Sequence, residues 1–63
     1  MELKNLLKKY DDCTIVKLFD IDGDNYYKGT SSVALDNLPA EMLEDEVIFE
    51  VKEEQNIVKI YTC

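Results

Sequence analysis

The chain contains no histidine, no arginine and no tryptophan. Without histidine it lacks the side chain that most often acts as a base near neutral pH and as a nitrogen ligand to zinc. Nucleophile pairs of the Ser-His and Cys-His kind are excluded for the same reason. Catalysis would depend on carboxylates, lysine or tyrosine in a domain too small to enclose much of a pocket. We therefore expect a protein that is not an enzyme and that uses no cofactor or metal.

Basic residues are few as well. Seven lysines stand against fourteen acidic residues, and the formal net charge is −7. Non-specific nucleic-acid binding needs lysine or arginine to neutralise phosphates, and anionic membrane surfaces attract the same residues. We expect neither direct DNA or RNA binding nor attachment to a membrane, and no apolar run is long enough to span one.

Cysteine is also scarce, with Cys13 and Cys63 far apart and no CxxC pair. The first ten residues, MELKNLLKKY, form an amphipathic pattern rather than a secretion signal. This combination favours a cytoplasmic protein with two unpaired thiols, and a single disulfide is the alternative. A hydrophobic fraction of 46% in 63 residues predicts one folded domain over residues 1–63.

Two short helices are predicted. Residues 2–10 form the first, which Asp11 and Asp12 end. The second lies in LDNLPAEMLEDE, with Asp36 and Asn37 near its cap and Pro39 in its first turn. The first helix has an apolar face at helical spacing, made by Leu3, Leu6, Leu7 and Tyr10.

Residues 13–21 and 26–33 are predicted to form a β-hairpin, because the first segment is rich in β-branched and aromatic residues and turn residues follow it. If the turn has an even number of residues, Phe19 and Tyr26 share a face with Lys17 and Lys28. We take that face as the outward one.

The turn itself, DIDGDN, resembles the start of a calcium loop. Asp20, Asp22 and Asp24 fit the first, third and fifth positions of an EF-hand. The twelfth position, however, is Ser31 instead of the bidentate glutamate, and the flanking segments are strands instead of helices. A solvated hairpin turn is the better interpretation.

VIFEVK and IVKIYT, on either side of EEQN, predict a second hairpin. A four-residue loop would place Glu50 opposite Lys59 and Ile48 opposite Tyr61, which gives a favourable cross-strand charge pair. The apolar face would then consist of Val47, Phe49, Val51, Val58 and Ile60.

Joining the two hairpins predicts a two-layer α+β domain of order α-β-β-α-β-β. Its sheet would have four antiparallel strands, with both helices on the apolar face.

Two groups of side chains are candidates for binding a partner. One is apolar and would lie on the outward face beside Ile48, unless a helix covers that side as well. The other is acidic and would either meet a basic surface, as a decoy for nucleic acid, or serve only for solubility. The apolar candidates are Phe19, Tyr26 and Tyr61, and the acidic ones are Asp20, Asp22, Asp24, Glu44, Asp45 and Glu46.

The segments LLKKYDDCTIVKLFDIDGD, YYKG, LPAEMLEDEV and IVKIY resemble a family of small acidic proteins encoded in bacterial prophages and related mobile elements. Gly29, Leu38, Pro39 and Leu43 match that pattern best, and residues 31–34 resemble an insertion. The family has no assigned activity, so the resemblance implies only a phage or prophage origin and a bacterial cytoplasmic setting.

These observations predict a small non-enzymatic module that binds another protein through that protein's basic surface. One concrete form is an inhibitor of a host protein that handles nucleic acid. The alternative is a structural protein that self-associates, for example as a homodimer.

Overall fold

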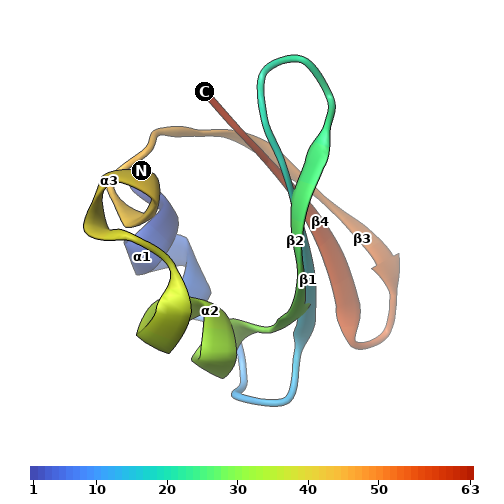
Figure 1. Cartoon of the computed structure of the whole chain (residues 1–63). Coiled ribbons are helices and arrows are strands. Elements are labelled where there is room, and N and C mark those ends of the chain that lie inside the picture. Colours follow the sequence, from blue (N-terminus) through green and yellow to red (C-terminus); the bar gives the residue numbers. More distant parts are fainter.

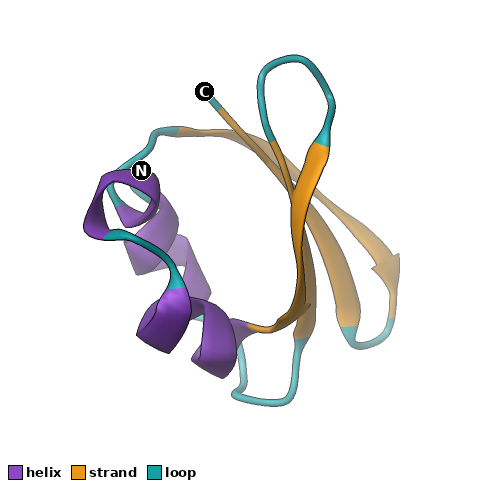
Figure 2. Cartoon of the chain, in the orientation of Figure 1, coloured by secondary structure: helices purple, strands orange, loops and turns teal.

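Four strands form one sheet, and three short helices pack against one of its faces (Figures 1 and 2). The computed structural model describes all residues, 1–63. None of its helices has the length and apolarity needed to cross a membrane. The elements are α1 (Leu3–Leu7), β1 (Ile15–Phe19), β2 (Asn25–Thr30), α2 (Ser31–Asn37), α3 (Ala40–Leu43), β3 (Val47–Glu54) and β4 (Ile57–Thr62).

The α+β class and both hairpins are confirmed, but the sheet is mixed. Its strand order is β2-β1-β4-β3, and β1 runs parallel to β4. The prediction of a purely antiparallel sheet was therefore wrong for the central pair. Turn signals specify pairing within each hairpin, whereas the choice of strands that join two hairpins depends on burial. The strands β1 and β4 alternate buried and half-buried residues, so they lie side by side in the centre.

The core lies between the helices and the central strands. Leu18 and Ile60 are fully buried on neighbouring strands, and Leu3 and Leu7 of α1 are fully buried opposite the sheet. The predicted apolar face is confirmed for Leu3, Leu6 and Leu7, but α1 ends at Leu7 instead of Tyr10, which is half-buried in the turn that follows. The eight buried hydrophobic residues are Leu3, Leu6, Leu7, Val16, Leu18, Ala34, Val58 and Ile60.

One helix, α2, was not predicted. The strand expected over 26–33 ends at Thr30, whose hydroxyl accepts a hydrogen bond from the Val33 amide at 3.3 Å. This contact is an N-terminal cap, which starts a helix where the prediction continued the strand. Asp36 and Asn37 therefore lie in the last turn of α2, and Pro39 occupies the N-cap position before α3 instead of its first turn.

The second hairpin has the predicted strands but a different register. Phe49 pairs with Tyr61, and Glu50 pairs with Ile60. Irregularities between Val47 and Phe49 and between Lys52 and Glu54 shift the middle of β3 by one residue. Because a shift of one residue turns every side chain to the opposite face, Phe49 and Val51 lie on the outward face and not in the core.

A similar irregularity affects Tyr26 in the first hairpin. Leu18 pairs with Tyr27 and Phe19 with Asn25, which leaves Tyr26 without a partner on β1. Tyr26 packs against the core and its hydroxyl lies 3.0 Å from that of Thr62, which is 1% exposed. The prediction that Tyr26 faces outward was therefore wrong.

Candidate protein-binding surface

Three aromatic rings stack across the outward face of the sheet, and we call Phe19, Tyr61 and Phe49 the aromatic row. The ring centroids of Phe19 and Tyr61 are 4.8 Å apart, and those of Phe49 and Tyr61 are 4.4 Å apart. The helices lie on the opposite side of the sheet (Figure 2), so the alternative in which a helix covers this face is wrong. The row crosses three neighbouring strands, β1, β4 and β3.

The row is most exposed where it reaches the edge strand. This strand, β3, carries three large hydrophobic residues that are about half exposed: Ile48 at 50%, Phe49 at 49% and Val51 at 46%. On so small a domain, adjoining apolar residues of this size are unusual outside a binding surface. Stacked aromatic side chains also bind partners well, since they are large and lose little conformational freedom.

A small group of charges lies beside the row on the same face. Glu53 accepts a hydrogen bond from the Lys17 ammonium at 2.6 Å and lies 3.6 Å from that of Lys59. The hydrogen bond from Lys17, followed by the charges of Lys17 and Lys59, lowers the pKa of Glu53. Both lysines are therefore paired within the protein, and Lys28, opposite Lys17 on β2, is the lysine of this face that has no ion pair.

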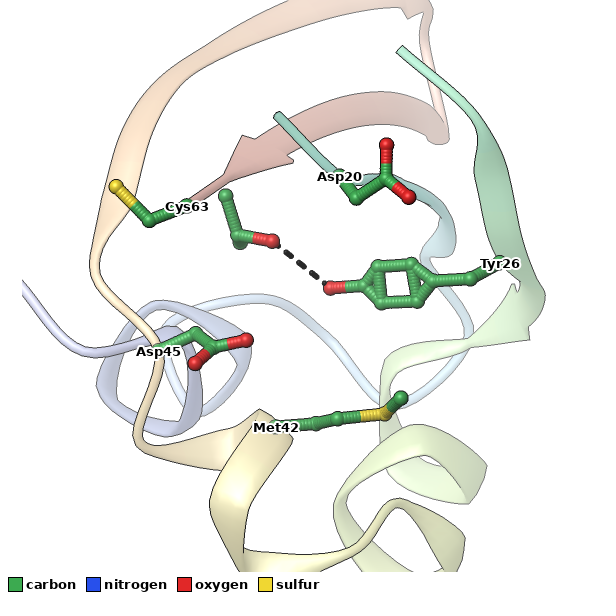
Figure 3. Close-up of a pocket in the computed structure, with 6 residues that line it drawn as sticks. Asp20, Tyr26, Met42, Asp45 and Cys63 are labelled. Carbon is green, nitrogen blue, oxygen red and sulfur yellow. Dashed lines mark hydrogen bonds between the residues drawn. The ribbon is translucent and has the colours of Figure 1, made fainter. Parts of the chain in front are cut away.

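The two acidic clusters predicted from sequence meet at one end of the molecule, which we call the acidic end. It consists of the turn after β1 and the segment between α3 and β3 (Figure 1). Asp20 and Asp45, one from each segment, line the same cavity (Figure 3). The members of the acidic end are Asp20, Asp22, Asp24, Glu44, Asp45 and Glu46.

The cavity at the acidic end has a volume of about 140 Å³. Tyr26 extends into it from β2, and Met42 of α3 lies across from Tyr26 (Figure 3). Burial raises the pKa of Tyr26, and the charges of Asp45 and Asp20 add to that rise, while the hydrogen bond with Thr62 opposes it. The phenol therefore stays neutral and acts as a hydrogen-bonding group. Cys63 completes the lining of the cavity, and its thiol is exposed and unpaired, as is that of Cys13.

The aspartate-rich segment forms the turn of the first hairpin. The Asp20 carboxylate accepts hydrogen bonds from the backbone amides of Asp22 at 2.9 Å and Asp24 at 3.0 Å. Gly23 has φ +86°, a conformation that glycine adopts without strain. One carboxylate oxygen, Oδ1 of Asp20, thus shapes the turn. No three acidic or cysteine side chains in the structure gather closely enough to hold a metal ion.

The remaining acidic residues point to solvent. Asp22, Asp24 and Glu44 are exposed, and Glu46 forms an ion pair with the Met1 amino group. The aromatic row borders this end of the molecule, because Phe19 immediately precedes Asp20 and lies at the end of β1. The structure therefore brings Asp20 and Asp45 together with Tyr26 on the helix side of the sheet, while Phe19 and Tyr61 lie on the outward face and approach this end only at the step from Phe19 to Asp20.

Phe49 is the member of the row that the sequence analysis missed. Its alternation with Val47 and Val51 indicated a core residue, and only the irregularity at Ile48 moves it to the outward face. Two other aromatic residues, Phe19 and Tyr61, were already expected on that face. A third aromatic residue near the start of the edge strand was the available signal for a stack across three strands.

Searches against protein-family models, curated proteins and solved structures found no match to this chain.

Proposed function

We propose that this chain is a non-enzymatic protein-binding module that contacts a basic partner. The observation that carries the proposal is the aromatic row on an uncovered sheet face, together with an acidic end that begins at Asp20, the residue after Phe19. The row would supply the apolar contact, and the acidic end would supply long-range attraction and orientation. Interfaces commonly combine a buried aromatic centre with a polar, charged rim.

Charge favours a basic partner protein over nucleic acid. The net charge of −7 repels phosphates, and two lysines on the outward face are paired with Glu53. Complementary charge raises the association rate, and this effect weakens as salt increases. We therefore expect binding that depends on salt for its rate and on the aromatic row for its lifetime.

An inhibitor is the concrete form that we favour. A basic surface that holds DNA or RNA in its own function would also attract the acidic end, and occupation by this chain would exclude the nucleic acid. The resemblance to small acidic prophage proteins is consistent with that role in a bacterial cytoplasm.

Affinity capture from the cells that carry this gene tests the proposal. The immobilised proteins are the wild type, Phe49→Ala in the row, Asp45→Asn/Glu46→Gln at the acidic end, and Val33→Ala as a control. Val33 is a suitable control because it is 48% exposed on α2, away from the row. A basic protein retained by the wild type and the control, but lost with the other two variants, is the expected result.

Two outcomes contradict the proposal. One is that no basic protein is retained by the wild type at low salt. The other is that all four proteins retain the same species, because the row and the acidic end would then make no contact with them. Circular dichroism of each variant confirms that it is folded before the comparison is made.

A further inference from the structure

The strand β3 lies at the edge of the sheet, and most of its outer side is free. The N-terminal segment covers only the approach to the strand, where the Leu3 amide donates to the Asp45 carbonyl at 2.9 Å and the Val47 amide donates to the Met1 carbonyl at 2.8 Å. Residues 48–54 are all exposed. An uncovered edge of this length offers unpaired backbone groups to another strand.

Side chains in the middle of β3 alternate between the outward face and the helix side of the sheet. Phe49 and Val51 lie on the outward face, while Glu50 and Lys52 lie on the helix side, where they pair with Ile60 and Val58 of β4. Neither Glu50 nor Lys52 forms an ion pair within the protein. Glu50 and Lys52 therefore present opposite charges without an ion-pair partner, two residues apart on the same face, with the Glu50 carboxylate beside the Tyr10 hydroxyl.

We propose that β3 binds β3 of a second copy of this chain, antiparallel, with the two-fold axis at Val51. In this register Glu50 of each copy lies opposite Lys52 of the other, which gives two reciprocal charge pairs from one strand. Opposite charges at directly facing positions stabilise strand pairing, and like charges destabilise it. The surface is complementary to itself, as a two-fold dimer requires.

Other two-fold registers fit less well. An axis at Glu50 places the two Glu50 carboxylates face to face, and an axis at Lys52 does the same for the two ammonium groups. An axis at Phe49 places Glu50 opposite the apolar Ile48. An axis at Glu53 pairs Lys52 with Glu54, but it places the two Glu53 residues face to face and Glu50 opposite Asn56, beyond the end of β3. Only the axis at Val51 pairs Glu50 with Lys52, so we choose it.

The length of the free edge agrees with this register. An axis at Val51 pairs residue 48 with residue 54 of the second copy, and it therefore uses residues 48–54. The backbone hydrogen bonds of the N-terminal segment reach only Asp45 and Val47, so this segment stays outside the paired region. Phe49 would face Glu53 of the second copy, whose carboxylate is already bound to Lys17 and Lys59.

A disulfide trap tests the register directly. Facing positions in antiparallel strands have Cα atoms about 4.5–5.5 Å apart, within the range that a disulfide spans. The variant is Val51→Cys in a background with Cys13→Ser and Cys63→Ser, both of which replace exposed thiols. The matched control is Lys28→Cys in the same background, since Lys28 is exposed on β2 at the other edge of the sheet.

Oxidation should convert most of the Val51→Cys protein to a dimer on a non-reducing gel and leave the Lys28→Cys protein monomeric. Equal cross-linking of both variants, or none of either, would overturn the proposed pairing. Circular dichroism shows whether each variant is folded. This experiment uses pure protein, so its failure is separate from a failure of the capture experiment above.

Sedimentation of charge variants provides the second test. Glu50→Lys alone and Lys52→Glu alone each replace two attractive pairs by two repulsive ones, and each should weaken the dimer about tenfold. The exchange Glu50→Lys/Lys52→Glu restores both pairs and should return the wild-type association constant. A wild type that stays monomeric at every concentration, or an exchange variant as weak as the single variants, contradicts the proposal.

Discussion

The ring of Phe49 stacks on the ring of Tyr61, with 4.4 Å between the centroids and 18° between the planes. This contact exists because the irregularity between Val47 and Phe49 turns Phe49 away from the helices. Tyr61 also stacks on Phe19, so one ring joins the central strands to the edge strand. The outward face thereby gains a continuous aromatic surface.

The stack should appear as a coupling energy in the stability of the protein. Phe49→Ala and Tyr61→Ala, alone and together, form a double-mutant cycle measured by urea unfolding. We expect a coupling of about 0.5–1.5 kcal/mol, because stacked aromatic pairs contribute this much beyond their burial. The control cycle combines Tyr61→Ala with Val33→Ala, which lies on α2. A coupling in the first cycle no larger than in the control would contradict the stack.

The core should be far more sensitive than the first turn. Leu18→Ala removes a fully buried side chain and should lower the free energy of unfolding by about 2–5 kcal/mol. Ile21→Ala removes a side chain that is 72% exposed and should change it by less than about 0.5 kcal/mol. Urea unfolding of both variants provides the comparison. Similar losses from the two substitutions would show that the core is assigned wrongly.

Asp20 should stabilise the first hairpin through its carboxylate. Asp20→Ala removes the acceptor of two backbone amides and should cost about 1 kcal/mol in the free energy of unfolding. Asp20→Asn keeps an acceptor oxygen and should cost less. Asp22→Ala is the control, since both of these hydrogen bonds in the turn go to the Asp20 carboxylate and neither goes to that of Asp22. If Asp20→Ala and Asp22→Ala have equal effects, the proposed role of Asp20 is wrong.

Tyr10 should make the protein less stable at high pH. Its hydroxyl oxygen is buried without a hydrogen-bond partner, and burial, followed by the neighbouring Glu50 carboxylate, raises its pKa from 10.0 to about 12. The unfolded chain therefore releases this proton first as the pH rises. The contribution to stability is fully present below about pH 10 and is lost between about pH 10 and 12.

Tyr10→Phe checks this account. The variant has no proton to release at this position, so its stability should fall less steeply than that of the wild type over the same pH range. Some fall should remain, because burial also raises the pKa of Tyr26 and Tyr27. At neutral pH the variant should be as stable as the wild type or more so, since it buries no unpartnered hydroxyl. Identical slopes for the two proteins would exclude a contribution from Tyr10.

Local patterns predicted the parts of the fold that local physics determines. The spacing of Leu3, Leu6 and Leu7 identified the buried face of α1, and the turn residues around Gly23 located the first hairpin. The alternation in β4 correctly placed Val58 and Ile60 inside. These elements follow from a repeat of 3.6 or 2 residues or from one turn conformation, which a single sequence displays.

Features that depend on contacts between distant segments were not predictable in this way. The parallel pairing of β1 with β4 depends on which strands the helices cover, and the irregularities beside Tyr26 and Phe49 depend on neighbouring strands. For the candidate surface, Phe19 and Tyr61 were placed correctly. Tyr26 was predicted on the outward face and lies on the helix side, whereas Phe49 was predicted in the core and lies on the outward face. Parity counting fails at such sites, because one added residue reverses the orientation of the side chains that follow.

Both binding proposals require that Phe49 lies on the outward face beside Tyr61, and nuclear Overhauser effects between the rings test this most directly. We expect cross-peaks from the Phe49 ring to the Tyr61 ring, and from the Tyr61 ring to the Phe19 ring, in the wild-type protein. Phe49 should show none to Leu3 or Leu7 on the helix side. Cross-peaks from Phe49 to Leu3 or Leu7, without any to Tyr61, would contradict the register of β3 and both proposed surfaces with it.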